Sequence, residues 1–310
     1  ETLQIYMDLA ECEGVLMHID ESNDYMNEAL THAETKLEKL RVYYLMTRMH
    51  QEHDSSDKLI DIGFRALELG NMNITRSVKK LDIVKEFVKV KWALRHKTNE
   101  DLLNLPAIDN EEIDILIQIM IAFSRLSSHP NISVMLFLRL LRLQLKYGAS
   151  TQAPIVYCNY ALILISGFDD IEGALRFGSL AKELADASED IYIKARVYFI
   201  YSIFLHHWQH DLPSAIELMR QSQLCTNELG MNYITTSHSC FVCNTRFLSG
   251  DSLVDVQQEI VTQQDRYGQH PNPLAEDFLA ELQYWIEALR NGDIVPEYHM
   301  PITLEDEAMV

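Results

Sequence analysis

Apolar residues recur at helical spacing in the second half of this chain, in runs that follow short polar turns. An aspartate followed by an apolar residue marks each turn, and successive aspartates are 41, 40 and 42 residues apart. The four steps are Asp170-Ile171, Asp211-Leu212, Asp251-Ser252-Leu253 and Asp293-Ile294, and amphipathic runs follow the first three. One helical hairpin cannot bury its apolar face alone, so a repeat near 40 residues predicts stacked helical hairpins.

Paired helices are predicted along most of the chain. Residues 3–70 predict two hairpins, with turns at 18–22 and 53–56. The segments 113–123 and 132–145 are apolar on most faces, so we expect them to be the best-buried helices, with Gly148 as the C-cap of the second. The 40-residue units pair 153–166 with 171–187, 192–207 with 213–229, and 233–248 with 253–266, and 273–290 starts a fourth hairpin.

Residues 74–97 differ from the rest in charge, because they hold eight of the 26 basic residues. Leu81, Val84, Val88 and Trp92 form an apolar stripe at helical spacing within them. The pattern predicts an amphipathic helix with a solvated basic face. The alternative is a docking patch for an acidic neighbour, including the acidic repeats of this chain.

Composition narrows the classes of protein further. Glycine (11) and proline (8) are scarce among the 310 residues, which favours long helices over a turn-rich β fold. Acidic residues outnumber basic ones by 46 to 26, and the formal charge of −20 disfavours binding to nucleic acid or to anionic lipid. Solubility is the simple interpretation of this acidity, and an acidic docking surface is the alternative.

Cysteine usage and hydropathy predict a cytoplasmic location. The five cysteines are odd in number and lie mostly in apolar helical contexts, which suits a reducing compartment better than a disulfide framework. The longest apolar segment, 113–145, is interrupted by charged residues and by Pro130, so membrane insertion is not expected. No basic-then-apolar signal peptide opens the sequence.

Two small clusters are candidates for chemistry. His206 and His210 are one helical turn apart beside His207 and could share a metal ion, but no glutamate follows in a metalloprotease pattern. Cys240 and Cys243 have C-x-x-C spacing without a second ligand pair. We interpret both clusters as structural. Phosphate-binding and kinase motifs are absent from the sequence, so we expect no catalytic, cofactor or metal site.

A partner-binding groove is the remaining candidate site. Tyrosines and asparagines recur on the first helices of the predicted hairpins, which line the concave surface in helical-hairpin solenoids. The candidates are Tyr157, Asn159, Tyr160, Tyr198, Tyr201, Tyr233 and Asn244. Tyrosine on such a surface can stack on a bound peptide or hydrogen-bond to it. Packing between repeats is the alternative for the same side chains.

The hairpins around Ala29 and Ala66 resemble tetratricopeptide repeats, although the tryptophan of that consensus is missing. The succession of segments also resembles one helical region of large signalling proteins, which join a serine/threonine kinase-like domain, an AAA-type (STAND) ATPase, this region, a GAF domain and a histidine kinase. The matching stretches, in order, are 63–69, 100–106, 147–150, 160–164, 174–178, 228–230 and 250–256. Residues 70–74 depart from the usual Gly-Ile-x-Leu-Pro.

The resemblance implies an all-α, right-handed solenoid of tetratricopeptide-like hairpins whose parent carries its catalytic residues elsewhere. We expect two hairpins in 1–73, a basic helix and an apolar pair in 74–150, three and a half hairpins in 151–294, and an acidic tail in 295–310. A sequence that begins with Glu1 is expected to come from a longer polypeptide.

The expected function is a non-catalytic scaffold or sensor that binds a protein, a peptide or neighbouring domains of its own polypeptide. One alternative is a free-standing peptide receptor or adaptor. The other is a metal-dependent hydrolase built on His206.

Overall fold

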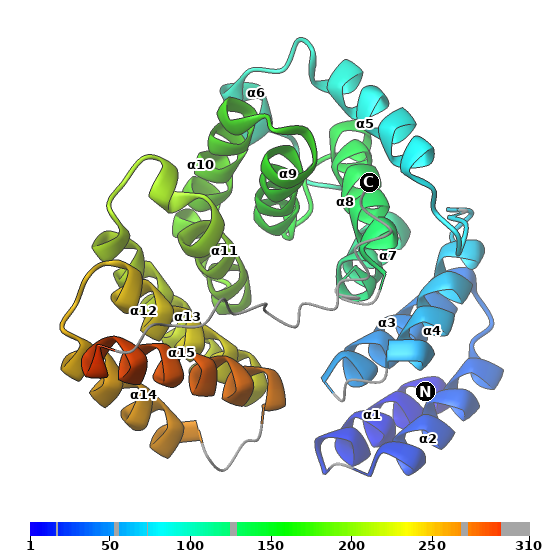
Figure 1. Cartoon of the computed structure of the whole chain (residues 1–310). Coiled ribbons are helices and arrows are strands. Elements are labelled where there is room, and N and C mark those ends of the chain that lie inside the picture. The colour runs from blue at the N-terminus through cyan, green and yellow to red at the C-terminus, as the bar shows by residue number, and fades with distance from the viewer. Residues whose placement is uncertain (17, 53–55, 73, 125–128, 268–271, 293–310) are drawn as a thin grey trace. The chain divides into compact units, whose positions relative to one another are not determined.

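The chain is built from helices, as the sequence predicts. The computed structural model describes residues 1–310 except 17, 53–55, 73, 125–128, 268–271 and 293–310. Within those ranges it contains 15 α-helices, one 3₁₀ turn and no strand (Figure 1). The all-α prediction is therefore confirmed, while the tetratricopeptide-like solenoid stays a prediction.

The chain divides into two compact units, residues 1–188 and 189–310. The first unit holds α1 (Thr2–Val15), α2 (Ile19–His32), α3 (Lys36–Glu52), α4 (Ser56–Leu69), α5 (Lys80–Leu94), α6 (Asn99–Leu103), α7 (Glu111–Phe123), α8 (Pro130–Tyr147), α9 (Ala153–Phe168) and α10 (Ile171–Ala187). The second holds α11 (Ile191–Phe204), η1 (His206–Trp208), α12 (Leu212–Glu228), α13 (Asn232–Leu248), α14 (Leu253–Tyr267) and α15 (Pro273–Asn291).

The aspartate steps that mark the repeat have a local cause. The Asp170 carboxylate accepts the amide of Gly173 at 2.9 Å, and the Asp211 carboxylate accepts that of Ser214 at 3.0 Å. Each aspartate is thus the N-cap of its second helix, α10 or α12, and satisfies a backbone donor that the helix leaves unpaired. Asp251 instead pairs with Arg246, and Asp293 lies outside the described residues.

Helix pairing in the first unit follows the predicted hairpins only in part. Neighbours in sequence pair as α1 with α2, α3 with α4, and α9 with α10. However, α7 packs on α3 and α4, while α5 packs on α8, and each of these pairs joins helices that are not neighbours in the sequence. In Figure 1, α9 lies between α8 and α10. The basic segment therefore contributes the helix α5, which packs on α8 in the first unit.

The core of the first unit lies where the apolar helices meet. Leu116, Phe123 and Leu136 of α7 and α8 are fully buried, as predicted for those two segments. The α9 helix is buried as extensively, with both Tyr157 and Tyr160 inaccessible to solvent. Gly148 ends α8 with a φ of +111°, which confirms its predicted place at the C-cap.

Candidate functional site

The two groove tyrosines of the first unit are interior residues. Both Tyr157 and Tyr160 have 0% of their surface exposed, and burial raises the pKa of Tyr157 to about 12. The Tyr157 hydroxyl donates to the carbonyl of Leu102 at 3.3 Å, and the Tyr160 ring meets Phe177 edge-on at 4.7 Å. Asn159 is half-buried and donates to the carbonyl of Ile155 on its own helix. These contacts favour the packing interpretation.

The groove candidates of the second unit are similar. Tyr198 and Tyr201 are buried, and Tyr201 lies edge-on to His206 at 5.8 Å. Asn244 is half-buried within α13. The Tyr233 side chain lies outside the described part of the chain. All four described tyrosines are buried, so their rings are not accessible to a peptide.

The two buried tyrosines of α9 allow a matched test of this packing role. Tyr160→Phe should leave the free energy of unfolding unchanged or raise it by up to about 1 kcal/mol, because its buried hydroxyl has no hydrogen-bond partner among the described residues. Tyr157→Phe should lower it by about 0.5–1.5 kcal/mol, because the bond to Leu102 is lost. Urea unfolding followed by circular dichroism measures both. Equal losses in the two variants would contradict this assignment.

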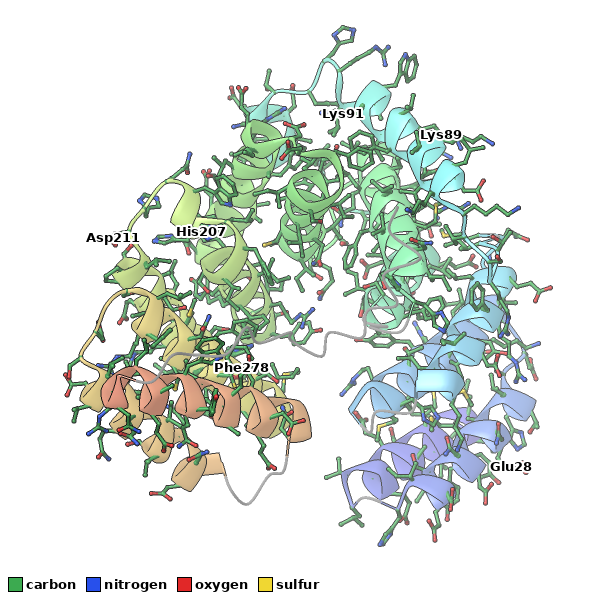
Figure 2. All side chains as sticks on the ribbon, viewed as in Figure 1. Glu28, Lys89, Lys91, His207, Asp211 and Phe278 are labelled. Carbon is green, nitrogen blue, oxygen red and sulfur yellow. The ribbon has the colours of Figure 1, made fainter. Side chains whose placement is uncertain are left out.

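The histidine cluster stabilises the turn between η1 and α12. His206 is buried, its Nε2 lies 2.7 Å from the Ser214 hydroxyl, and its ring stacks on His210 at 4.5 Å. His207 and the N-cap Asp211 lie on the same turn (Figure 2). No group of three or more metal-ligating side chains occurs among the residues that the structure describes. The contacts of His206 therefore join η1 to α12.

The C-x-x-C cysteines are core residues. Cys240 and Cys243 lie in a cluster with Val256 and Ile286, and burial raises the pKa of both thiols to about 12. The Cys240 thiol donates to the carbonyl of Ala275 at 3.4 Å. Because the thiolate is the reactive and metal-binding form, these neutral thiols suit packing rather than redox or metal chemistry.

The α5 helix has one buried apolar face and one exposed apolar stripe. Its inner face carries Phe87, Val90 and Leu94, and the Phe87 ring stacks on Phe168 with centroids 3.6 Å apart. Val90 and Leu94 are buried. The stripe at positions 81, 84, 88 and 92 therefore lies on a different face of the helix.

Ion pairs hold α5 in this orientation. The buried carboxylate of Glu86 accepts from Arg142 of α8 and from Lys89 at 3.0 Å. Burial opposes ionisation of Glu86, but the hydrogen bonds and charges of Arg142 and Lys89 outweigh it and hold its pKa below the ordinary value. Lys91 donates to Asp170 at 2.8 Å, which ties α5 to the start of α10. Figure 2 labels Lys89 and Lys91 on this helix.

The predicted stripe consequently faces solvent. Leu81 is 62% exposed, Val84 46%, Val88 60% and Trp92 66%. The helix is amphipathic with a solvated basic face, as expected, but its buried face is the one that carries Phe87, Val90 and Leu94 and not the predicted stripe. The guanidinium of Arg95 stacks over Trp92 at 3.6 Å, which shields one side of the indole.

Within the described residues, no helix is long and apolar enough to cross a membrane. No family model and no solved structure matches the chain. The chain is similar to hybrid signal transduction histidine kinase G of Dictyostelium discoideum, with 20% identity over 325 aligned positions that cover 96% of this chain. The chain spans 9% of that relative's own length. It is therefore similar to a region of a signalling protein.

Proposed function

We propose that this chain is a non-catalytic interaction region of a larger signalling protein. The observation that carries the proposal is the extent of the similarity to the histidine kinase, which covers 96% of this chain and 9% of that protein. A match of that shape is expected when one helical region is shared between long multidomain chains. Helical arrays of this kind generally present surfaces to other proteins or to neighbouring domains.

The contrast between the buried polar side chains and the exposed stripe of α5 supports a binding role. The buried tyrosines, the histidine cluster and the neutral thiols all serve packing, as their contacts indicate. The exposed stripe of α5 is different, because nothing among its described contacts explains four solvated apolar side chains in a row. A partner that binds this region could change the output of a neighbouring domain if the parent protein has two conformational states. The partner would have to bind one of these states more tightly than the other.

A more specific assignment of the parent protein follows from the seven stretches between residues 63 and 256 that resemble the helical region of large signalling proteins. In that arrangement the region lies between an AAA-type (STAND) ATPase and a GAF domain, in the cytoplasm. It would pack on the ATPase or bind a partner, and its release would change ATPase or kinase output. The fragment itself would neither hydrolyse ATP nor transfer phosphoryl groups.

The native gene product gives the test. We expect an antibody against this chain to detect a band well above its 35.8 kDa in source cells. Lysine-directed cross-linking of that product should join this region to another domain or to a second protein. The purified fragment should show no ATP turnover above a blank.

Each contrary outcome removes a different part of the proposal. A band near 35.8 kDa would favour a free-standing peptide receptor or adaptor. Robust ATP hydrolysis by the pure fragment would show that the region is catalytic.

A further inference from the structure

The outward face of α5 combines apolar and basic side chains and no acidic ones. Its exposed residues are Lys80, Leu81, Val84, Lys85, Val88, Lys89, Lys91, Trp92 and Arg95. The segment 74–97 has eight basic residues against two acidic ones, a formal charge of +6 in a chain of −20. Of the two acids, Glu86 is buried and doubly paired, and Asp82 accepts the Lys79 amide.

The arrangement around the stripe is that of a helix seam. The apolar positions are spaced by three, four and four residues and extend over about 16 Å at 1.5 Å per residue. At about 100° per residue, Lys85 and Lys89 fall on one side of the stripe, and Lys91 and Arg95 fall on the other. Coiled-coil helices place charges in the same way on both sides of an apolar seam, where they select the partner.

Single exposed apolar residues are common on protein surfaces, but a contiguous apolar patch with a polar rim marks an interaction site. The opposite face of α5 is packed against the rest of the unit through Glu86, Phe87, Val90 and Leu94, so the helix that carries the stripe is already formed. A preformed seam loses little conformational freedom on binding, which favours affinity.

We propose that α5 docks an acidic amphipathic helix of a protein partner. Apolar side chains of that helix would cover Leu81, Val84, Val88 and Trp92, and its carboxylates would face Lys85 and the other basic residues. Lys80 and Lys85 form no ion pair within the described structure and remain open to such carboxylates. The proposal rests on the proposed function, since it names the surface through which the region would bind.

Charge favours a protein helix over other occupants. A bilayer rich in anionic lipid would attract α5 but would also meet the rest of a chain whose net charge is −20. A second copy of α5 would place lysines against lysines. An acidic helix satisfies the stripe and both basic flanks together.

The purified chain and a designed peptide test the proposal. The probe is a fluorescent peptide of about three heptads, with leucine at positions a and d and glutamate at e and g. Fluorescence anisotropy should show saturable binding that weakens as salt rises and is absent for a scrambled peptide. Val88→Asp and Lys85→Glu should each weaken binding about tenfold or more.

Matched substitutions elsewhere control for charge and fold. Val15→Asp replaces another exposed valine, and Lys58→Glu makes the same charge change on α4. Both should leave peptide affinity unchanged, and circular dichroism should show that all four variants are folded. Equal loss in the control variants, or no binding by the parent chain, would overturn the proposal.

Vesicle co-sedimentation and native cross-linking separate the docking of a protein helix from lipid binding and from binding elsewhere on the region. Co-sedimentation with phosphatidylserine vesicles that is lost in Val88→Asp, without peptide binding, would assign the seam to lipid and overturn the proposal. If native cross-links involve this region but the α5 seam binds no peptide, the interaction function stands and the assignment to α5 fails.

Discussion

Replacing Gly148 with alanine should lower the free energy of unfolding by about 2–4 kcal/mol. Gly148 has φ +111° and ψ 169°, a backbone conformation that residues with a Cβ rarely adopt. A Cβ there would lie 2.5 Å from the carbonyl oxygen of Pro106 and 3.1 Å from the carbonyl carbon of Ala107. Because both neighbours are backbone atoms, the strain cannot be relieved by a side-chain rotation.

The contact at Gly148 joins distant parts of the first unit. The Ala149 amide donates to the Pro106 carbonyl at 2.8 Å, and the Ile108 amide donates to the Ala149 carbonyl at 3.0 Å. This short bridge ties the segment before α7 to the turn between α8 and α9. Displacing this bridge would therefore weaken the packing of the segment before α7 against the turn between α8 and α9.

Gly167→Ala is the matched control for Gly148. Gly167 lies in the last turn of α9, and a Cβ there would meet nothing within 4 Å. Its stability should change by less than about 0.5 kcal/mol or rise slightly, as alanine favours helix. Guanidinium unfolding followed by circular dichroism measures both variants. A Gly148→Ala protein as stable as the parent would show that the bridge can move without cost.

The local features of the fold were predictable because local chemistry causes them. Asp170 and Asp211 cap the helices that they precede, and Gly148 follows α8 as the pattern indicates. Helix pairing beyond neighbours was not predictable. Periodicity shows that α7 has an apolar surface, but it does not show that α3 and α4 cover it.

The four described groove tyrosines are buried, and the sequence left open whether they pack between helices or bind a partner. Tyrosine suits a solvated binding surface and a helix interface equally well by type. Only the neighbours decide, and Phe177 and Leu102 enclose Tyr160 and Tyr157. A signal was present in the sequence, because α9 is apolar on nearly every face, which is the pattern of a helix with no solvated side.

The α5 helix shows the same ambiguity in reverse. It carries two apolar stripes, and the one at 81, 84, 88 and 92 is the more regular of the two in the sequence. The other, at 83, 87, 90 and 94, includes the buried Val90 and Leu94 and the Phe87 ring that stacks on Phe168 of α9. Phe87 and the carboxylate of Glu86 beside Arg142 select it, and neither partner is near α5 in sequence.

Phe123→Ala and Trp92→Ala should therefore differ sharply, although both remove an aromatic ring from an apolar helical position. Phe123 is fully buried at the end of α7, where it meets Phe64 edge-on at 5.2 Å and lies directly over Gly63 of α4. Its removal leaves a cavity between two helices, and we expect a loss of about 3–5 kcal/mol. For a unit of this size, that corresponds to a fall in melting temperature of roughly 6–20 °C.

Trp92→Ala should cost less than about 1 kcal/mol, because the side chain is 66% exposed and its ring stacks only against the guanidinium of Arg95 among the described residues. Thermal melts of the two variants and the parent measure the contrast. A loss for Trp92→Ala close to that for Phe123→Ala would mean that the α5 stripe is covered in the folded chain, and the docking seam would then be excluded. A small loss leaves Trp92 free for a partner, so the same variant can be used in the peptide assay without a change in fold.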